Sequence, residues 1–368
     1  MSVDLRGPAA ATTLVEAIRN PSSLVRLDAT SWEGVLSCAR RNAVLAYLGE
    51  RAWSQGVIDE LPEVPRDSLL SARVSAARLA QLARWELDRA RRVLHAVEIP
   101  MIALKGVAYL LRGMPHAATR LLSDIDIMVP RSSLAEAEKL LHAAGWRATN
   151  LDPYDQRYYR QWSHEIPPLQ YPGRILALDV HHTICPPVSR LRPDPEAFWA
   201  ASEAHGDSGV RVLSPVDSVL HAAVHLFFDS DFDGRFRDLV DLHELLAAFS
   251  ADDAFWHDLV SRAREQGLGR PLYYALQALS RVLGTPIPTA TSREALGFRP
   301  PLPVALWMNR TLAEVLAPID PQRWPPAHRG RLWLLYVRSH WLRMPAHLLV
   351  PHLVRKSLRK GRQYSADV

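Results

Sequence analysis

The tripeptide Asp124-Ile125-Asp126 is the segment of this 368-residue chain whose residue types and spacing say most about chemistry. Side chains alternate along a β-strand, so a strand here directs both carboxylates to one face and the isoleucines to the other. Two carboxylates this close repel each other unless a cation neutralises them. The spacing therefore favours a site for a hard divalent metal ion.

A third acid, Asp179, lies in RILALDVHHTI (residues 174–184), which predicts another strand. Its leucines and Val180 would bury one face, while Asp179 and His181 share the opposite face. If the two strands are neighbours, Asp124, Asp126 and Asp179 converge. Three such carboxylates form the ligand set of a two-Mg²⁺ site for phosphoryl or nucleotidyl transfer. Asp179 and His181 are the candidate general bases of such a site.

A turn at Leu104-Lys105-Gly106 would complement these acids, because IPMIALKG (residues 99–106) predicts a short strand that ends before a helix. Backbone N–H groups at such a junction can bind phosphate oxygens, and Lys105 would add a positive charge. Only four of the 44 basic residues are lysines, so a lysine here favours a specific need for it. A plain turn with a solvated lysine is the alternative.

Further charged residues are candidates for the rest of a cleft. Arg120 precedes Asp124 by four residues and could contact a triphosphate or pair with an acid. His221 and His225 share a helix face, but HAAVH lacks the glutamate of the HExxH metalloprotease motif, which favours a core or acceptor-pocket position. The remaining candidates follow on a predicted helix and would either line the cleft or form a surface charge network: Arg235, Arg237, Asp238 and Asp241.

The hydrophobic pattern outlines the elements that must position these residues. It is helical from Ser31 to about Val97, and the second long helix is expected to bury a stripe of apolar residues. That expected stripe consists of Val74, Leu79, Leu82, Trp85 and Val93. Short strands and helices follow, with a polar aromatic stretch between Gly145 and Arg174 that we interpret as an insertion or lid loop. From Ser214 the helical period returns.

We therefore expect an α+β protein in which a small mixed β-sheet core is flanked by N- and C-terminal helical units. The expected division is an N-terminal helical unit (1–97), an α/β core (98–205), a helical domain (206–300) and a basic, proline-punctuated helical tail (301–368). With 48% hydrophobic and 23% charged residues, the composition excludes a disordered, collagen-like or coiled-coil chain.

Charge and cysteine content add further expectations. Residues 321–368 hold ten Lys and Arg against one acid, so their net charge is +9. The rest of the chain has a net charge of −4, and the two together give the formal net charge of +5. Such a tail could lie on a membrane surface, contact nucleic acid, or pack with solvated arginines, which is the default. Cys38 and Cys185 cannot form a disulfide framework or a four-ligand zinc site. With no leader pattern and no long apolar run, a cytoplasmic protein is expected.

The succession IALKG, a short helix, RLLSDIDIMV and LDVHHTI resembles the nucleotidyltransferase fold. More narrowly, the chain is similar to the uncharacterised nucleotidyltransferase family of bacteria, often found near genes for modified peptides or other natural products. The resemblance covers roughly residues 30–250, from the helix WEGVLSCARRNAVLAYL to the segment between His225 and Asp241.

This resemblance implies roles for the candidate residues. Asp124 and Asp126 would bind metal, and Asp179 would be the third acid. The triphosphate would lie against Lys105, Gly106 and Ser123. Typical members place Gly-Gly or Gly-Ser in the turn, so the lysine either takes over phosphate contacts or occupies the nucleotide site.

The function expected is thus Mg²⁺-dependent transfer of a nucleoside monophosphate from a nucleoside triphosphate, with ATP favoured. The acceptor would be a small molecule or peptide of bacterial specialised metabolism. One alternative is a catalytically inactive protein of the same fold that binds a peptide or partner enzyme. Nucleotidyl transfer to RNA is a further alternative that we favour less.

Overall fold

A mixed β-sheet lies at the centre of the computed structural model, which describes residues 9–148, 152–206, 209–228, 231–252, 254–320 and 326–351. Within these ranges the sheet has seven strands, in the order β3-β4-β5-β2-β1-β7-β6. The strands are β1 (Met101–Ala103), β2 (Asp124–Met128), β3 (Arg147–Ala148), β4 (Leu169–Gln170), β5 (Ala177–His181), β6 (Glu203–Ala204) and β7 (Val210–Val212).

The two acid-bearing strands are direct neighbours. β2 and β5 pair in parallel, with Asp126 opposite Asp179 and Ile125 opposite Leu178. β1 pairs with β2 in antiparallel and with β7 in parallel orientation, which makes the sheet mixed. The condition on which the convergence of the three acids depended, that the two strands are neighbours, is therefore met.

Helices precede the sheet in the chain, as the period predicted. They are α1 (Ala9–Arg19), α2 (Ala29–Arg41), α3 (Leu45–Ser54) and α4 (Glu63–His95), with 3₁₀ turns η1 (Pro21–Arg26) and η2 (Ile58–Glu60). The helix α2 begins after Asp28, whose Oδ1 accepts a hydrogen bond from the Ser31 backbone N–H at 2.8 Å and so satisfies one free donor of the first turn.

The stripe expected on α4 is wrong at two positions, because Val74 and Trp85 are exposed. The face that α4 buries is instead rich in alanine: Leu69, Ala76, Ala80, Ala83, Leu87, Ala90 and Leu94. Small side chains let neighbouring elements approach the helix closely. Trp85 lies outside, where the guanidinium of Arg174 covers its ring at 4.6 Å.

Helices also connect and follow the strands. Those around the sheet are α5 (Lys105–Leu111), α6 (Leu134–Ala143), α7 (Pro153–Gln161) and α8 (Pro195–Ala201), with η3 (Pro115–Thr119) and η4 (Arg131–Ser133). The later ones are α9 (Pro215–Phe228), α10 (Phe236–Phe249), α11 (Phe255–Glu265), α12 (Gly269–Val282), α13 (Thr289–Ala295), α14 (Leu302–Leu316) and α15 (Pro326–Arg343), with η5 (Leu296–Phe298).

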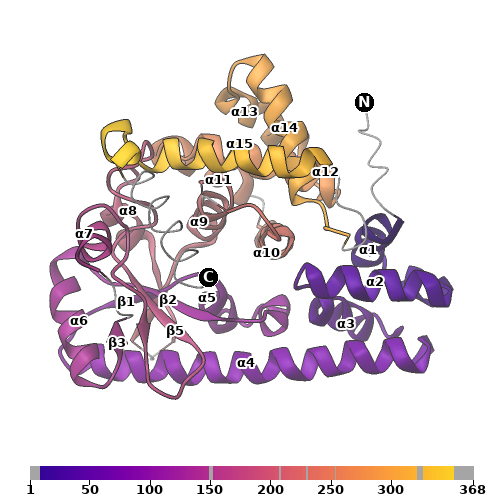
Figure 1. Cartoon of the computed structure of the whole chain (residues 1–368), viewed down its shortest axis with the longest axis horizontal. Helices are drawn as coiled ribbons and strands as arrows, with labels where there is room; N and C mark the ends of the chain where they lie inside the picture. The colour runs from indigo at the N-terminus through magenta and orange to yellow at the C-terminus, as the bar shows by residue number, and fades with distance from the viewer. Residues whose placement is uncertain are drawn as a thin grey trace, which may run out of the picture.

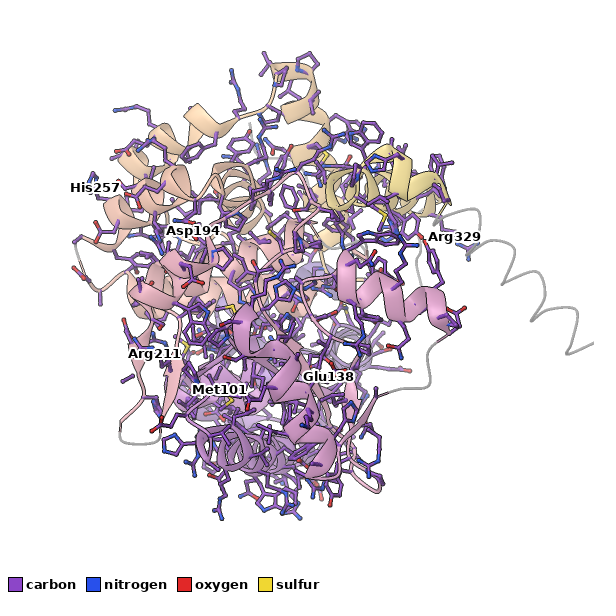
Figure 2. The ribbon with its side chains drawn as sticks, turned by 90° about the vertical axis from the view of Figure 1, so that its left-hand side faces the viewer. Met101, Glu138, Asp194, Arg211, His257 and Arg329 are labelled. Carbon is purple, nitrogen blue, oxygen red and sulfur yellow. The ribbon has the colours of Figure 1, made fainter. Side chains whose placement is uncertain are left out.

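The helices enclose the sheet from opposite sides. Figure 1 shows α4 running along one side of the sheet and of α3, while α9 to α15 lie along the other side. Figure 2 shows the same layers from the side, with Met101 and Arg211 of the sheet below Asp194 and His257. One continuous cluster of buried apolar side chains joins all these layers. The α+β class with helical flanks is confirmed, and the four-part division stays a prediction.

The polar aromatic stretch between Gly145 and Arg174 is not the loop that we expected. Its described part contains β3, the helix α7 and β4, so it extends the sheet beyond β5. Asp152 caps α7, and Pro153 occupies its first turn. The segment therefore fixes side chains beside β5.

The helix α15 packs against α14 and α9, and its Leu335 and Ser339 are fully buried. This agrees with the packed-helix interpretation for that part of the tail. Most of the tail's basic residues lie outside the described ranges, in 321–325 and 352–368. Among the residues that the structure describes, no helix is long and apolar enough to cross a membrane.

We expect the free energy of unfolding to fall as the pH falls from 7.5 to 5.5. Burial, and then the charge of Lys105, lowers the pKa of His221 from 6.5 to about 3. Below pH 6.5 the unfolded chain binds a proton at this histidine and the folded chain does not. Stability is therefore lost on acidification, by up to about 1.4 kcal/mol per pH unit.

Urea unfolding at the two pH values measures this dependence. The variant His221→Leu removes the titrating group from a buried position of α9 and should show a smaller loss than the native chain. Equal losses in both proteins would contradict the assignment.

Candidate functional site

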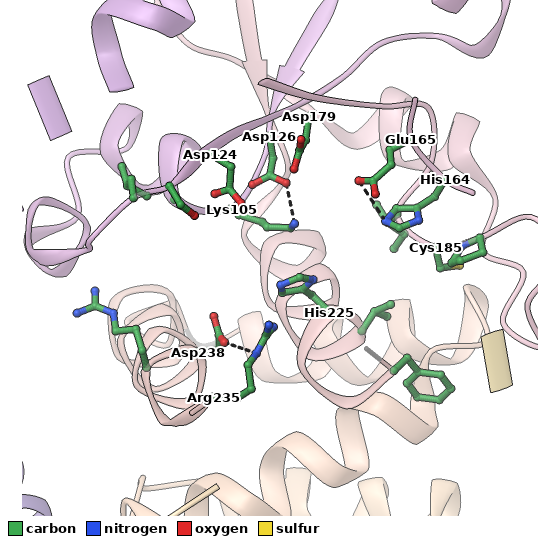
Figure 3. A pocket seen from close by; sticks show the side chains of 18 of the residues that line it. Lys105, Asp124, Asp126, His164, Glu165, Asp179, Cys185, His225, Arg235 and Asp238 are labelled. Atoms are coloured by element: carbon green, nitrogen blue, oxygen red, sulfur yellow. Dashed lines mark hydrogen bonds and ion pairs between the residues drawn. The ribbon is translucent and has the colours of Figure 1, made fainter. Parts of the chain in front are cut away.

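A cavity of about 530 Å³ lies between the acid-bearing strands and the helices α9 and α10. Most of the predicted site residues line it: Lys105, Gly106, Arg120, Ser123, Asp124, Asp126, Asp179, His225, Arg237 and Asp238. In Figure 3 the three aspartates point toward Lys105, and His225 and the ion pair of Arg235 with Asp238 lie across from them. His181 and Asp241 are not in the lining, and each contacts a residue that is.

Burial and mutual repulsion set the charge of the carboxylates. Burial, and then the charge of Asp126, raises the pKa of Asp124. Burial, followed by Asp126 and Glu165, raises the pKa of Asp179 to about 7. Asp179 Oδ1 is also buried without a hydrogen-bond partner among the residues described. An oxygen-rich set with an unsatisfied buried acceptor suits Mg²⁺, which would relieve the repulsion.

Lys105 is the cation that contacts these acids in the structure. Its Nζ donates a hydrogen bond to Asp126 Oδ1 at 2.7 Å. Burial opposes the charged amine, but Asp126 and then Glu165 and Asp124 outweigh it, so the pKa of Lys105 is raised. The backbone of Lys105 has φ of +48°, a left-handed conformation that costs a residue with a side chain about 1–2 kcal/mol. Such strain at a site residue is a sign of function.

His181 contacts the same oxygen of Asp126 from the neighbouring strand. Its Nε2 lies 3.0 Å from Asp126 Oδ1, and its side chain is 1% exposed. Burial favours the neutral acid at Asp126, yet Lys105 and His181 hold the pKa of this carboxyl well below its usual value. Asp126 is therefore ionised over the whole physiological pH range, whereas Asp179 titrates near neutrality.

The charged residues of α10 do not form a surface network. Arg237 and Asp241 are buried, and Arg237 Nε donates to Asp241 Oδ1 at 3.0 Å. Arg237 Nη2 also donates to the backbone carbonyl of His116 at 2.9 Å, which ties α10 to η3. Arg120 forms an ion pair with Asp241 Oδ2, so it pairs with an acid while it lines the cavity.

Two residues of the cavity wall, His164 and Glu165, were missed in the sequence. They lie in the stretch interpreted as a loop, where Glu165 forms an isolated antiparallel bridge with His181. In the described part of the chain, they and His181 form the one group of three metal-ligating side chains whose donor atoms all lie within 4.8 Å of one another. The available signal in the sequence was a histidine followed by a glutamate. The residues around this pair gave no indication that it lies beside His181.

A mixed sheet with acids on two adjacent strands, beside a strand, turn and helix, is the arrangement expected of the nucleotidyltransferase class. A family model described as uncharacterised nucleotidyltransferase matches residues 28–284, and the chain belongs to this family. The match extends beyond the 30–250 of the predicted resemblance. Comparisons with curated proteins and with solved structures gave no significant match.

The variant Lys105→Met tests whether this amine stabilises the buried acids. It removes the cation and keeps the strained backbone, so we expect it to lower the free energy of unfolding by about 3 kcal/mol when divalent metal is chelated. Lys105→Gly also removes the cation but relieves the strain, and should be more stable than Lys105→Met by up to about 1 kcal/mol.

Denaturant unfolding in EDTA measures both differences. Adding Mg²⁺ should restore part of the lost stability in both variants. A stability of Lys105→Met equal to that of the native chain would show that the ion pair does not hold the site together.

Proposed function

We propose that this protein is a Mg²⁺-dependent nucleotidyltransferase that moves a nucleoside monophosphate from a nucleoside triphosphate, with ATP the first candidate, to a small-molecule or peptide acceptor. One observation carries the proposal: Asp124, Asp126 and Asp179 lie on adjacent parallel strands at a cavity wall, where Asp179 Oδ1 is buried and has no hydrogen-bond partner among the described residues. Family membership supports the reaction class.

In this proposal the three aspartates hold Mg²⁺, which supplies charge stabilisation at the phosphates when it is bound. Ser123 and Gly106 line the cavity beside the acids and would contact the triphosphate. Lys105 Nζ would leave Asp126 for a phosphate oxygen, since the carboxylate then has another cation beside it. In this proposal the acids thus bind Mg²⁺ when the nucleotide is present and contact Lys105 when it is absent.

Asp179 is the better of the two candidate bases. It lines the cavity, where a carboxylate oxygen can reach the proton of an acceptor hydroxyl, as a general base must. His181 lies outside the lining and its Nε2 faces Asp126, so we assign it the task of positioning that carboxylate. The acceptor would lie toward α9 and α10, against His225, Arg237 and Asp238.

The contact between Lys105 and Asp126 favours one alternative, a protein of this fold that is catalytically inactive and binds a peptide or partner enzyme. A buried ion pair of 2.7 Å occupies an oxygen that the metal would need. In that case Lys105 blocks the nucleotide site permanently.

Replacing Asp179 tests the enzyme. With labelled ATP, Mg²⁺ and candidate acceptors, the native chain should release pyrophosphate, and Asp179→Asn should lower the rate by about 100- to 1,000-fold. Asp258→Asn, on the exposed side of α11, is the matched control and should keep the native rate. Full turnover by Asp179→Asn would refute the proposed site.

Mg²⁺-ATP binding by Lys105→Met separates the two functions. If Lys105 contacts phosphate, titration calorimetry should show weaker binding by the variant, by about tenfold or more for a lost charged hydrogen bond. If Lys105 blocks the site, the native chain should bind no Mg²⁺-ATP at millimolar concentration and the variant should acquire binding.

A further inference from the structure

Backbone pairing holds His164 and Glu165 against the end of β5. Glu165 bridges His181, the Ile166 N–H donates to the Val180 carbonyl at 3.0 Å, and the His182 N–H donates to the His164 carbonyl at 2.9 Å. These bonds fix the backbones of His164 and Glu165 relative to that of His181, so their side chains start from set positions beside it.

The donor atoms of these three side chains face one another. His181 Nδ1 lies 3.6 Å from Glu165 Oε2, and His164 Nε2 lies 3.8 Å from the same oxygen. Ligand atoms around a tetrahedral zinc ion are roughly 3.3 Å apart, given bonds of about 2.0 Å. The two distances to Glu165 Oε2 exceed this value by a few tenths of an ångström, and all three donor atoms lie within 4.8 Å of one another, so small side-chain movements would close the group around an ion.

A carboxylate orients the central ligand. Asp126 Oδ1 accepts a hydrogen bond from Lys105 Nζ and lies 3.0 Å from His181 Nε2, so Nε2 carries the proton that it donates to this oxygen, and the Nδ1 lone pair faces Glu165. That Nδ1 is buried without a hydrogen-bond partner in the part of the chain that is described. Histidine ligands of metals typically donate their other ring N–H to a carboxylate in this way.

We propose that His164, Glu165 and His181 bind one divalent transition-metal ion of the Zn²⁺ type, at a site separate from the Mg²⁺ site of the aspartates. Two imidazoles and one carboxylate favour such an ion over Mg²⁺, which prefers oxygen. His164 and Glu165 line the cavity, so a remaining coordination position opens into it. The ion holds the ring of His181, and through it the carboxylate of Asp126, in place. The proposal does not depend on nucleotidyl transfer.

Metal titration of the full chain tests this site. After treatment with EDTA, the protein is titrated with Co²⁺ or Zn²⁺ alone, without Mg²⁺ or nucleotide, by visible absorption and calorimetry. We expect one equivalent to bind with the absorption of a low-coordinate Co²⁺ site. His164→Ala and Glu165→Gln should weaken binding by about 100-fold or more, since loss of an outer partner alone costs about 10- to 100-fold.

His182→Gln is the matched control, because His182 adjoins His181 but its Nε2 faces the Ser163 carbonyl. It should bind Co²⁺ like the native chain, and so should the surface variant His257→Ala (Figure 2). If His164→Ala fails to unfold cooperatively, Glu165→Gln decides the question.

Absence of Zn²⁺ and Co²⁺ binding by the native chain, or native affinity in Glu165→Gln, would overturn the site. If the native chain binds Co²⁺ at this site but catalyses no nucleotidyl transfer, the proposed function is refuted and the metal site is not.

Discussion

Lys105 and His181 contact one carboxylate oxygen, Asp126 Oδ1, at 2.7 and 3.0 Å, and this shared contact allows the buried Asp126 to lie beside two half-buried acids, Asp124 and Asp179. Without it, Asp126 would repel Asp124 and Asp179 in a low-dielectric region, and all three would favour the neutral acid. With Lys105 and His181 beside it, the Asp126 carboxylate instead stays ionised, and the pKa values of its neighbours Asp124 and Asp179 are raised.

The helices create the burial that gives this contact its strength. α9 and α10 enclose the cavity opposite the strands, and the hydrogen bond from Arg237 to the His116 carbonyl ties α10 to η3. Since charges interact more strongly away from water, the same acids on an open sheet would have ordinary pKa values. The fold thus places three acids along one wall of the cavity, where a bound cation stabilises them, and in this structure Lys105 supplies that positive charge.

Local periodicity carried much of the fold prediction. The strand at Asp124 and the helices that follow Ser214 were predicted correctly, because alternation and the 3.6-residue period follow from backbone geometry. The stripe on α4 was wrong at Val74 and Trp85, since apolar character does not say which face the other layers cover. The polar stretch that contains α7 and β4 was taken for a loop, because its short strands gain stability from pairing with β5.

For the site, the local sequence was enough to place Asp124 and Asp126 on one strand face and to mark the lysine turn as unusual. Asp179 followed from the resemblance and from a conditional argument about neighbouring strands. The packing of the chain settled the rest: that Asp126 lies opposite Asp179, that Lys105 contacts Asp126, and that Glu165 bridges to His181. The physical reason is distance along the chain. Asp126 and His181 are 55 residues apart, and a contact across such a separation depends on how whole strands and helices pack.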